Sequence, residues 1–511
     1  MDDGGPGHAI DGHGLTLRQL EDVSRHSHPV QLDPAAIPRI DAARAAVDRI
    51  AATGTPTYGI NTGLGALSNR AIAPAELQTL QHNLLRSHAA GSGAPFPVDV
   101  VRATLLVRAN SLARGHSGVR TIVVQRLLDL LNTGITPVVP SQGSLGASGD
   151  LAPLAHLGLV LTGEGRVFDV DGRHVDATRR LADAGIEPLA LESKEALALI
   201  NGTAVMAGVA ALALIDARRL LASAVLVAAF SSFALGARRE PFDPRLHAVR
   251  SHPGQRRVGA TVRRLLGPLD DASRVTARVQ DPYSVRCIPP VVGAALDALG
   301  PLEAALEIEI NAATDNPLIF SGEDDALSGG NFHGHPLALP IEYAKVAVAS
   351  LGTFTERRIA LLMDAEEYGL PAFLVANPGT NSGYMIAHYL TAGLVAENKV
   401  LAHPSAVDSI PTSANIEDFN SMGATAARHL AEIVRNVEKV VAVEALCAAQ
   451  ACDLSGIRPG GALAEVYQLV RERVPTLEAD NRVVADEIEA ITELVRGGEV
   501  AAVLDWEGEP A

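Results

Sequence analysis

Apolar residues at helical spacing dominate the chain beyond residue 190. The pattern predicts long helices over residues 194–237, 286–313, 335–365, 380–402 and 417–453. Helices of this length, mostly without internal prolines, bury their apolar faces best against parallel and antiparallel neighbours. The sequence therefore predicts a long central helical bundle.

Shorter helical patterns fill the first part of the chain. They predict helices over residues 15–24, 38–52, 74–90 and 98–132. Thr16 is a candidate cap for the first of these helices. A further helix is predicted to start at Asp150, with Pro153 in its first turn.

Two polar segments, residues 168–173 and 320–325, are predicted to form hairpins or loops. No internal repeat or low-complexity linker interrupts the chain. We therefore predict a mainly α protein with two regions. These are an N-terminal helical domain over residues 1–200 and a central and C-terminal helical bundle over residues 201–511.

Composition agrees with this helical fold and argues against two classes of binding partner. Apolar residues make up 47% of the 511 residues and aromatic residues only 4%, which favours closely packed helices. The chain has 42 basic and 59 acidic residues, a net charge of -17. Nucleic acids and anionic membranes bind to basic surfaces, so we expect neither as a partner.

The chain carries no sign of secretion or membrane insertion. Its N-terminus has neither a basic start nor an apolar stretch, so no signal peptide is expected. Cys287, Cys447 and Cys452 are expected to be free thiols in a reducing compartment. The uncharged stretch 220–237 reaches only the lower limit of a membrane span, and a buried bundle helix suits its serines and alanines better. We predict a soluble cytoplasmic protein.

The glycine-punctuated segment Gly143–Asp150 carries the most specific chemistry. If the Gly149 nitrogen attacks the Ala147 carbonyl carbon, a ring closes, and loss of two waters leaves a methylene in place of the Ser148 hydroxyl. The product, 4-methylidene-imidazol-5-one, is a stronger electrophile than any side chain. The glycines permit the unusual backbone angles that ring closure needs. The positive end of the helix starting at Asp150 favours electron withdrawal.

The segment from Pro140 to His156 resembles, almost letter for letter, the cofactor segment of the aromatic amino acid ammonia-lyases and aminomutases. The resemblance extends from about Leu15 to Leu504. It implies a fold of the aspartase/fumarase-like superfamily, a carbon–nitrogen lyase and a homotetramer whose active sites draw on several subunits. It also implies that the cofactor forms autocatalytically from Ala147, Ser148 and Gly149, with no external cofactor and no metal.

Polar residues that interrupt the apolar helices supply the remaining candidates. Each alone would be interpreted as a helix cap or a satisfied buried group. Together they match the motifs of this family in order, and the resemblance implies a role for each. Tyr58 would remove the substrate β-proton as a phenolate, which requires a lowered pKa. The other implied roles are carboxylate binding for Arg286, bonds to the ring or carboxylate for Asn201 and Gln280, a second phenol for Tyr283, and packing against the ring for Phe332.

His88 and Glu417 resemble the members of the family that act on histidine. A carboxylate and an imidazole can both hydrogen-bond to a substrate imidazole, whereas a phenyl ring would leave them unsatisfied. The resemblance therefore implies deamination of L-histidine to trans-urocanate and ammonia, the first step of histidine degradation. The alternative is a tyrosine or phenylalanine ammonia-lyase or aminomutase. Four residues depart from the usual pattern of the histidine enzymes: Leu64, Pro290, Ile416 and Phe419.

Other classes of protein fit less well. Ser144 and Ser148 lack the glycine spacing of a hydrolase nucleophile elbow. His333 and His335 have no third metal ligand in view. The glycine-rich loop over residues 54–65 lacks the lysine of a phosphate-binding loop. A non-catalytic relative of the family would be expected to lose Ser148 or Tyr58.

Overall fold

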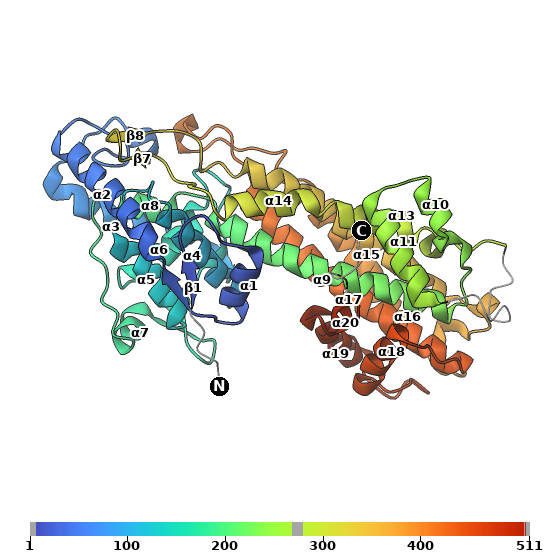
Figure 1. Cartoon of the computed structure of the whole chain (residues 1–511). Coiled ribbons are helices and arrows are strands. Elements are labelled where there is room, and N and C mark those ends of the chain that lie inside the picture. Colours follow the sequence, from blue (N-terminus) through green and yellow to red (C-terminus); the bar gives the residue numbers. More distant parts are fainter. Residues whose placement is uncertain (1–6, 268–278, 505, 507–511) are drawn as a thin grey trace. The chain divides into compact units, whose positions relative to one another are not determined.

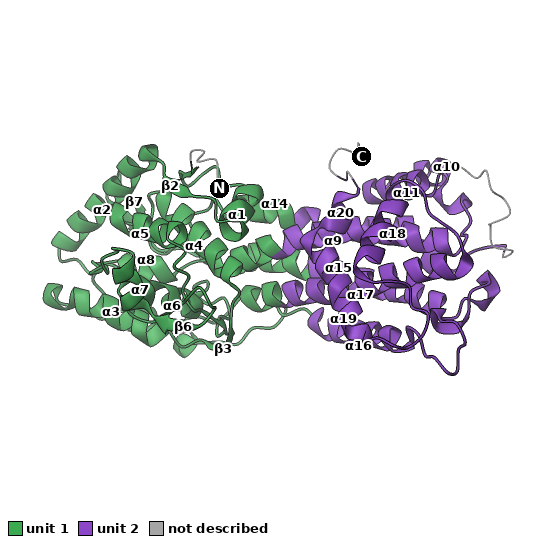
Figure 2. Ribbon diagram, turned by 90° about the horizontal axis from the view of Figure 1, so that it is seen from below, with its two compact units in different colours: residues 1–212, 302–342, 404–428 green, residues 213–301, 343–403, 429–511 purple. Residues whose placement is uncertain are grey.

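The computed structural model describes residues 7–267, 279–504 and 506, and its regular structure is almost entirely helical (Figure 1). The chain forms two compact units (Figure 2). Unit 1 comprises residues 1–212, 302–342 and 404–428, and unit 2 comprises residues 213–301, 343–403 and 429–511. The mainly α fold is confirmed. The division of the chain into residues 1–200 and 201–511 remains a prediction.

The helices of each unit are as follows. Unit 1 contains α1 (Leu17–Arg25), α2 (Ile37–Ala52), α3 (Leu77–His88), α4 (Val98–Ala113), α5 (Thr121–Asn132), α6 (Leu151–Leu161), α7 (Ala177–Asp183) and α8 (Glu195–Ile200). Unit 2 contains α10 (Pro244–Ala248), α11 (Pro253–Leu266), α12 (Tyr283–Arg286), α13 (Ile288–Asp297), α16 (Met385–Leu401), α18 (Ala462–Arg473), α19 (Val484–Gly497) and α20 (Glu499–Ala502). Helices with residues in both units are α9 (Ala204–Ala234), α14 (Gly300–Glu309), α15 (His335–Met363) and α17 (Gly423–Ser455).

Short elements complete the fold. The strands described are β1 (His8–Ile10), β2 (Val30–Leu32), β3 (Ser92–Pro95), β4 (Pro140–Gln142), β5 (Arg166–Phe168), β6 (His174–Asp176), β7 (Leu318–Phe320) and β8 (Asp325–Leu327). They form two-stranded sheets in sequence order, of which only β1 with β2 is parallel. The 3-10 turns described are η1 (Pro34–Ala36), η2 (Gly65–Leu67), η3 (Pro74–Glu76), η4 (Glu240–Phe242), η6 (Glu366–Tyr368), η7 (Ala372–Leu374) and η8 (Ser413–Asn415).

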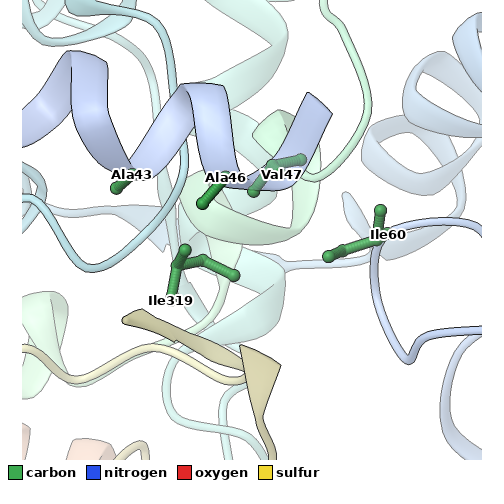
Figure 3. Close-up of a cluster of buried hydrophobic side chains, with 5 residues drawn as sticks. All are labelled: Ala43, Ala46, Val47, Ile60 and Ile319. Carbon is green, nitrogen blue, oxygen red and sulfur yellow. The ribbon is translucent and has the colours of Figure 1, made fainter. Parts of the chain in front are cut away.

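Helix α4 forms the centre of unit 1, where every residue from Val101 to Ala113 is buried. Helices α1, α2 and α5 pack against α4, while α3, α6 and α8 pack against one another. A smaller cluster joins Ala43, Ala46 and Val47 of α2 to Ile60 and Ile319 (Figure 3). Burial of these apolar groups fixes the loop after α2 on the β7–β8 hairpin.

Unit 2 contains a fully buried ion pair between two long helices. The Arg358 guanidinium of α15 donates to both carboxylate oxygens of Glu444 on α17, at 2.6 and 2.8 Å. Neither side chain has any exposed surface. Removing one partner would leave an uncompensated buried charge, so the pair fixes how α15 and α17 pack within this unit.

The long apolar helices of the structure are largely buried. The stretch from Leu220 to Ala234 forms the end of α9 and is buried apart from Phe233, as predicted for a bundle helix. Within the described residues, α15 is the one helix long and apolar enough to cross a membrane, and 56% of its most apolar window is buried. Length and composition alone do not separate a membrane span from a buried core helix, because a core helix can meet the same criterion.

Several sequence predictions are confirmed by these elements. The predicted helices over residues 38–52 and 335–365 correspond to α2 and α15. Thr16 caps α1 and forms a reciprocal capping box with Gln19. The polar segments 168–173 and 320–325 are the turns of the β5–β6 and β7–β8 hairpins.

Other predicted helices are interrupted. The predicted helix over residues 98–132 is wrong at its middle, because α4 and α5 are separate. Gly115 and Gly118 lie between them with φ of 76° and 68°. A side chain on Gly115 would come within 2.7 Å of the Arg39 backbone, so the chain turns where only glycine fits.

The same correction applies to three further segments. Residues 194–237 form α8 and α9, separated at Gly202 with φ of 136°. Residues 286–313 form parts of α12, α13 and α14, with Pro289 and Pro290 at the start of α13. Helix α17 begins at Gly423 rather than at residue 417.

Candidate active site

The Gly143–Asp150 loop is locked by close backbone packing. Ser148 has φ of 50°, and Gly143, Gly146 and Gly149 also have positive φ. A Cβ on Gly149 would lie 2.2 Å from the Gly202 carbonyl oxygen. A Cβ on Gly146 would lie 2.1 Å from Ser421 Oγ. The rigid Gly202 backbone leaves no room for a side chain at Gly149, whereas a side chain at Gly146 would have to displace the Ser421 hydroxyl.

Asp150 anchors this loop to the start of α9. The buried Asp150 carboxylate accepts the Val205 and Met206 amides at 3.0 and 2.8 Å, and the Ser144 hydroxyl at 2.9 Å. Its own amide donates to the Gly202 carbonyl at 2.8 Å. Burial raises the pKa of Asp150 to about 6, against the lowering effect of these hydrogen bonds. Two loops are thus joined through one carboxylate.

Asp150 was interpreted from the sequence only as a helix start, so its anchoring role was missed. The Asp150 side chain forms no capping bond to α6, the helix that follows it. It caps α9 instead, more than fifty residues further along the chain. A carboxylate directly after Gly149 was the only sequence signal, and nothing in the pattern identified its partner.

Glu417 lies against the serine of the loop. The Ser148 hydroxyl donates to Glu417 Oε1 at 3.3 Å, and the Thr412 hydroxyl donates to Oε2 at 2.9 Å. The backbone between them is strained, because Ser413, Ala414 and Asn415 have φ of 51°, 52° and 67°. Thr412, also missed in the sequence, orients the carboxylate toward Ser148.

The Tyr58 phenol is close enough to the Glu417 carboxylate for the charge of that group to affect its pKa. Burial raises the pKa of the Tyr58 phenol, and the negative charges of Glu417 and Asp315 raise it further, whereas a hydrogen bond with the Gly65 backbone lowers it. The described surroundings of Tyr58 therefore raise its pKa, and the lowered pKa that a catalytic phenolate requires stays a prediction.

His88 ends helix α3 and is also influenced by Glu417. Its Nδ1 lies 2.9 Å from the Leu84 carbonyl oxygen. Because a carbonyl only accepts, Nδ1 carries a proton, and Nε2 is the acceptor of the neutral ring. Burial lowers the pKa of His88, while this hydrogen bond and the Glu417 charge oppose the shift. His88 is therefore suited to act as a neutral hydrogen-bonding group.

Asn201 is buried directly before Gly202. Its side-chain Nδ2 donates to the Asn316 backbone carbonyl at 3.0 Å. The Asn201 backbone carbonyl accepts a hydrogen bond from Arg108 Nη1 at 2.6 Å. Within the described residues, Asn201 Oδ1 is buried and has no hydrogen-bond partner. A buried acceptor in this state favours a ligand that donates to it.

Phe332 is half-buried in the turn before α15, and Gly334 packs this turn against Ser421. A Cβ on Gly334 would lie 2.9 Å from the Ser421 hydroxyl, which also abuts Gly146 of the Gly143–Asp150 loop. His333 Nδ1 accepts from the His335 amide at 3.3 Å, and Nε2 donates to the Phe419 carbonyl at 3.1 Å. Both nitrogens of His333 are thus occupied, which argues against the metal alternative at this pair.

Two of the four residues that depart from the histidine pattern, Ile416 and Phe419, flank Glu417. Ile416 and Phe419 are 66% and 58% exposed. The Phe419 ring stacks on the His333 ring at 6.0 Å between centroids, with an interplanar angle of 11°. This contact holds the Glu417 loop on the turn that carries Phe332.

Gln280, Tyr283 and Arg286 belong to unit 2. Gln280 and Tyr283 are exposed, and the Arg286 guanidinium lies 4.4 Å from the centroid of the Tyr283 ring. The segment is held by Asp281, whose Oδ2 accepts the Arg238 amide at 2.8 Å. Unit 1 therefore brings together the loop, Tyr58, His88 and Glu417, while a separate cluster in unit 2 contains the proposed carboxylate-binding arginine.

The chain is similar to known lyases over nearly its whole length. The family model for aromatic amino acid lyases matches residues 15–472. Histidine ammonia-lyases from Symbiobacterium thermophilum and Deinococcus radiodurans are 48% and 50% identical to it, covering 97% and 94% of this chain and 97% and 93% of their own.

Solved structures give the same result. The histidine ammonia-lyase from Trypanosoma cruzi has a TM-score of 0.89 at 40% identity, over 97% of this chain and 94% of that one. The tyrosine aminomutase from Streptomyces globisporus has a TM-score of 0.92 at 38% identity, over 99% of each chain. One backbone thus serves relatives with different substrates and reactions.

The close packing of Gly149 can be tested against a matched glycine. Gly149 and Gly172 have φ of 77° and 73°, but a Cβ added to Gly172 would have no neighbouring atom within 4 Å. Gly172→Ala should cost only the conformational penalty, about 1–2 kcal/mol. Gly149→Ala must also displace Gly202 and should lower the unfolding midpoint in denaturant further. Equal midpoints would show that the loop does not depend on this contact.

Proposed function

Because the chain belongs to the aromatic amino acid lyase family and is a carbon–nitrogen lyase, we propose that it deaminates L-histidine to trans-urocanate and ammonia, the first step of histidine degradation. Relatives named histidine ammonia-lyase are 44–50% identical over most of the chain. The observation that carries the proposal is the position of Glu417. Its carboxylate accepts a hydrogen bond from Ser148, and its negative charge raises the pKa of both Tyr58 and His88.

We infer that Ala147, Ser148 and Gly149 form 4-methylidene-imidazol-5-one autocatalytically, without an external cofactor. The residues fit this reaction, because Gly149 carries no side chain to hinder its nitrogen and Asp150 holds the loop in its turn. The ring would supply an electrophile that takes up the substrate amine and makes its nitrogen a better leaving group.

The remaining residues bind the substrate and move its proton. His88 and Glu417 hydrogen-bond the substrate imidazole at its far end. Arg286 forms a bidentate pair with the substrate carboxylate, and Asn201 Oδ1 accepts a hydrogen bond from the substrate or the ring. Tyr58 removes the β-proton as a phenolate. Phe332 packs against the ring, while Gln280 and Tyr283 complete the polar wall.

We propose a homotetramer in which neighbouring subunits complete each site. The surroundings of Tyr58 in unit 1 raise its pKa, so a phenolate there would need positive charge contributed by another subunit. An apolar surface of unit 2 supports association: Tyr343, Val346, Ile386, Tyr389 and Val400 are all at least half exposed. A cytoplasmic location and the absence of nucleic-acid and membrane partners remain predictions.

Ring formation is tested by intact mass. Wild-type chain should be lighter than its sequence mass by two waters, because closure and methylene formation each release one. Ser148→Ala cannot form the methylene and should not show the full loss. Ser141→Ala, a serine variant just before the loop, should retain it. An active wild-type enzyme with the full unmodified mass would refute the cofactor.

Substrate choice is tested at Glu417. Glu417→Gln removes one charged hydrogen bond of about 1.5–3 kcal/mol, so kcat/KM for L-histidine should fall at least about tenfold. Activity on L-phenylalanine, if measurable, should fall less. His88→Phe should shift the ratio in the same direction, whereas Asp418→Asn, an exposed neighbour, should leave it unchanged.

The alternative substrates are outcomes of the same assay. Equal losses on both substrates would assign Glu417 a structural role. A wild-type preference for L-tyrosine or L-phenylalanine would identify a tyrosine or phenylalanine ammonia-lyase or aminomutase instead, and would leave the lyase chemistry intact.

Shared active sites are tested by subunit exchange. Tyr58→Phe and Arg286→Met should each be nearly inactive alone. Mixed tetramers should regain activity, because some sites combine a native Tyr58 with a native Arg286 from different chains. The matched control mixes Tyr58→Phe with Ser148→Ala, whose altered residues both lie in unit 1 and should not complement. No recovery in the first mixture, with exchange proven by mass, would contradict the shared site.

A further inference from the structure

We propose that His8, Asp22 and His28 form a binding site for a divalent transition-metal ion of the Zn²⁺ type. One potential ligand atom from each side chain lies within 4.8 Å of the others. Two imidazoles and a carboxylate suit Zn²⁺, Co²⁺ or Ni²⁺, whereas Mg²⁺ and Ca²⁺ prefer oxygen ligands alone. A water molecule would complete the coordination, as in three-ligand protein sites.

The distance between His8 and Asp22 suits an intervening ion. His8 Nε2 lies 3.6 Å from Asp22 Oδ2, longer than a good hydrogen bond. Ligands about 2.1 Å from a tetrahedral metal lie about 3.4 Å from each other. The two atoms are thus spaced as ligands of one ion. His28 is exposed, and its ligand atom lies within 4.8 Å of those of His8 and Asp22.

Backbone hydrogen bonds hold the three ligands together. The His8 amide donates to the Pro29 carbonyl at 2.9 Å, and the His28 amide donates to the Asp22 carbonyl at 3.1 Å. The parallel β1–β2 pair also sets His8 opposite Val30. These bonds fix the ligand-bearing segments before any ion binds, which lowers the entropic cost of binding.

The side chains also lack better partners. Within the described residues, His8 Nε2 is buried and makes no hydrogen bond. The His8 and His28 rings stack with centroids 5.8 Å apart and an interplanar angle of 19°. A metal ion would satisfy the buried nitrogen, while the exposed side of His28 leaves the site open to solvent.

The proposed ion would tie β1, the end of α1 and the segment before β2 into one clip. None of the three ligands belongs to the proposed catalytic machinery, so the site is independent of the proposed function. The family resemblance implied no metal, and the sequence analysis did not single out these three ligands. The fold brings them together through the turn after α1.

The test is Zn²⁺ titration of the full-length protein by calorimetry, with Co²⁺ absorption as a report on coordination. Wild type should bind one high-affinity Zn²⁺ per chain. His28→Ala and His8→Ala should weaken this binding at least about tenfold. His26→Ala removes an exposed histidine of the same segment that lies outside the cluster, and should bind as wild type does.

A second variant separates ligation from an effect on folding. Cysteine also binds Zn²⁺, so His28→Cys should keep tight binding and shift the Co²⁺ spectrum toward thiolate coordination. Zn²⁺ should raise the thermal unfolding midpoint of wild type and His26→Ala but not of His28→Ala. Equal Zn²⁺ affinity in wild type and His28→Ala, or an equal loss in His26→Ala, would overturn the proposal.

Discussion

The Asp150 carboxylate holds the Gly143–Asp150 loop and the start of α9 in a single arrangement. It accepts two amides of the first α9 turn and one serine hydroxyl of its own loop. The Gly202 backbone bonds to both Ser148 and Asp150, so the loop cannot move independently of the turn between α8 and α9. The positions of Ser148 and Asn201 both follow from this one anchor.

The arrangement requires strain and desolvation that other packing must offset. Burial of Asp150 disfavours its charged form, which is why its pKa lies near 6. Ser148 and residues 413–415 occupy left-handed backbone conformations, each costing of order 1–3 kcal/mol. The buried helices around α4, and the apolar cluster that fixes the Tyr58 loop, supply rigid supports for these conformations (Figure 3).

The sequence pattern predicts the helical fold well where local physics decides it. Helices α2 and α15 follow their apolar periodicity, and Thr16 forms its predicted cap. The breaks at Gly115 and Gly118 were missed although both glycines lie in the polar segment Arg114–Gly118, which is a local turn signal. The break at Gly202 is explained by the packed structure, where an added Cβ would meet Arg108 and Thr314. That crowding is a property of the packed structure.

In the candidate site, too, the local residue types could be predicted from the sequence, but the contacts made by the fold could not. The loop at Ser148 was identified from its residue types, but its contact with Glu417 spans 269 positions and no periodicity reports it. The lowered pKa that a Tyr58 phenolate requires stays a prediction, and the burial and negative charge that raise the pKa within one chain come from the fold and could not be predicted from the sequence. Asp150 was visible in the motif, yet its partners on α9 were not.

The close packing of Gly149 against Gly202 also has a consequence for when a reactive group could form in the chain. The tight turn packs against the backbone around Gly202, so this contact forms only when both segments are present. An electrophile made from this loop would thus arise only after both segments have met. Nascent and unfolded chains would carry an ordinary serine there, harmless toward the amines and thiols of the cell, and the reactive group would appear only inside a finished fold.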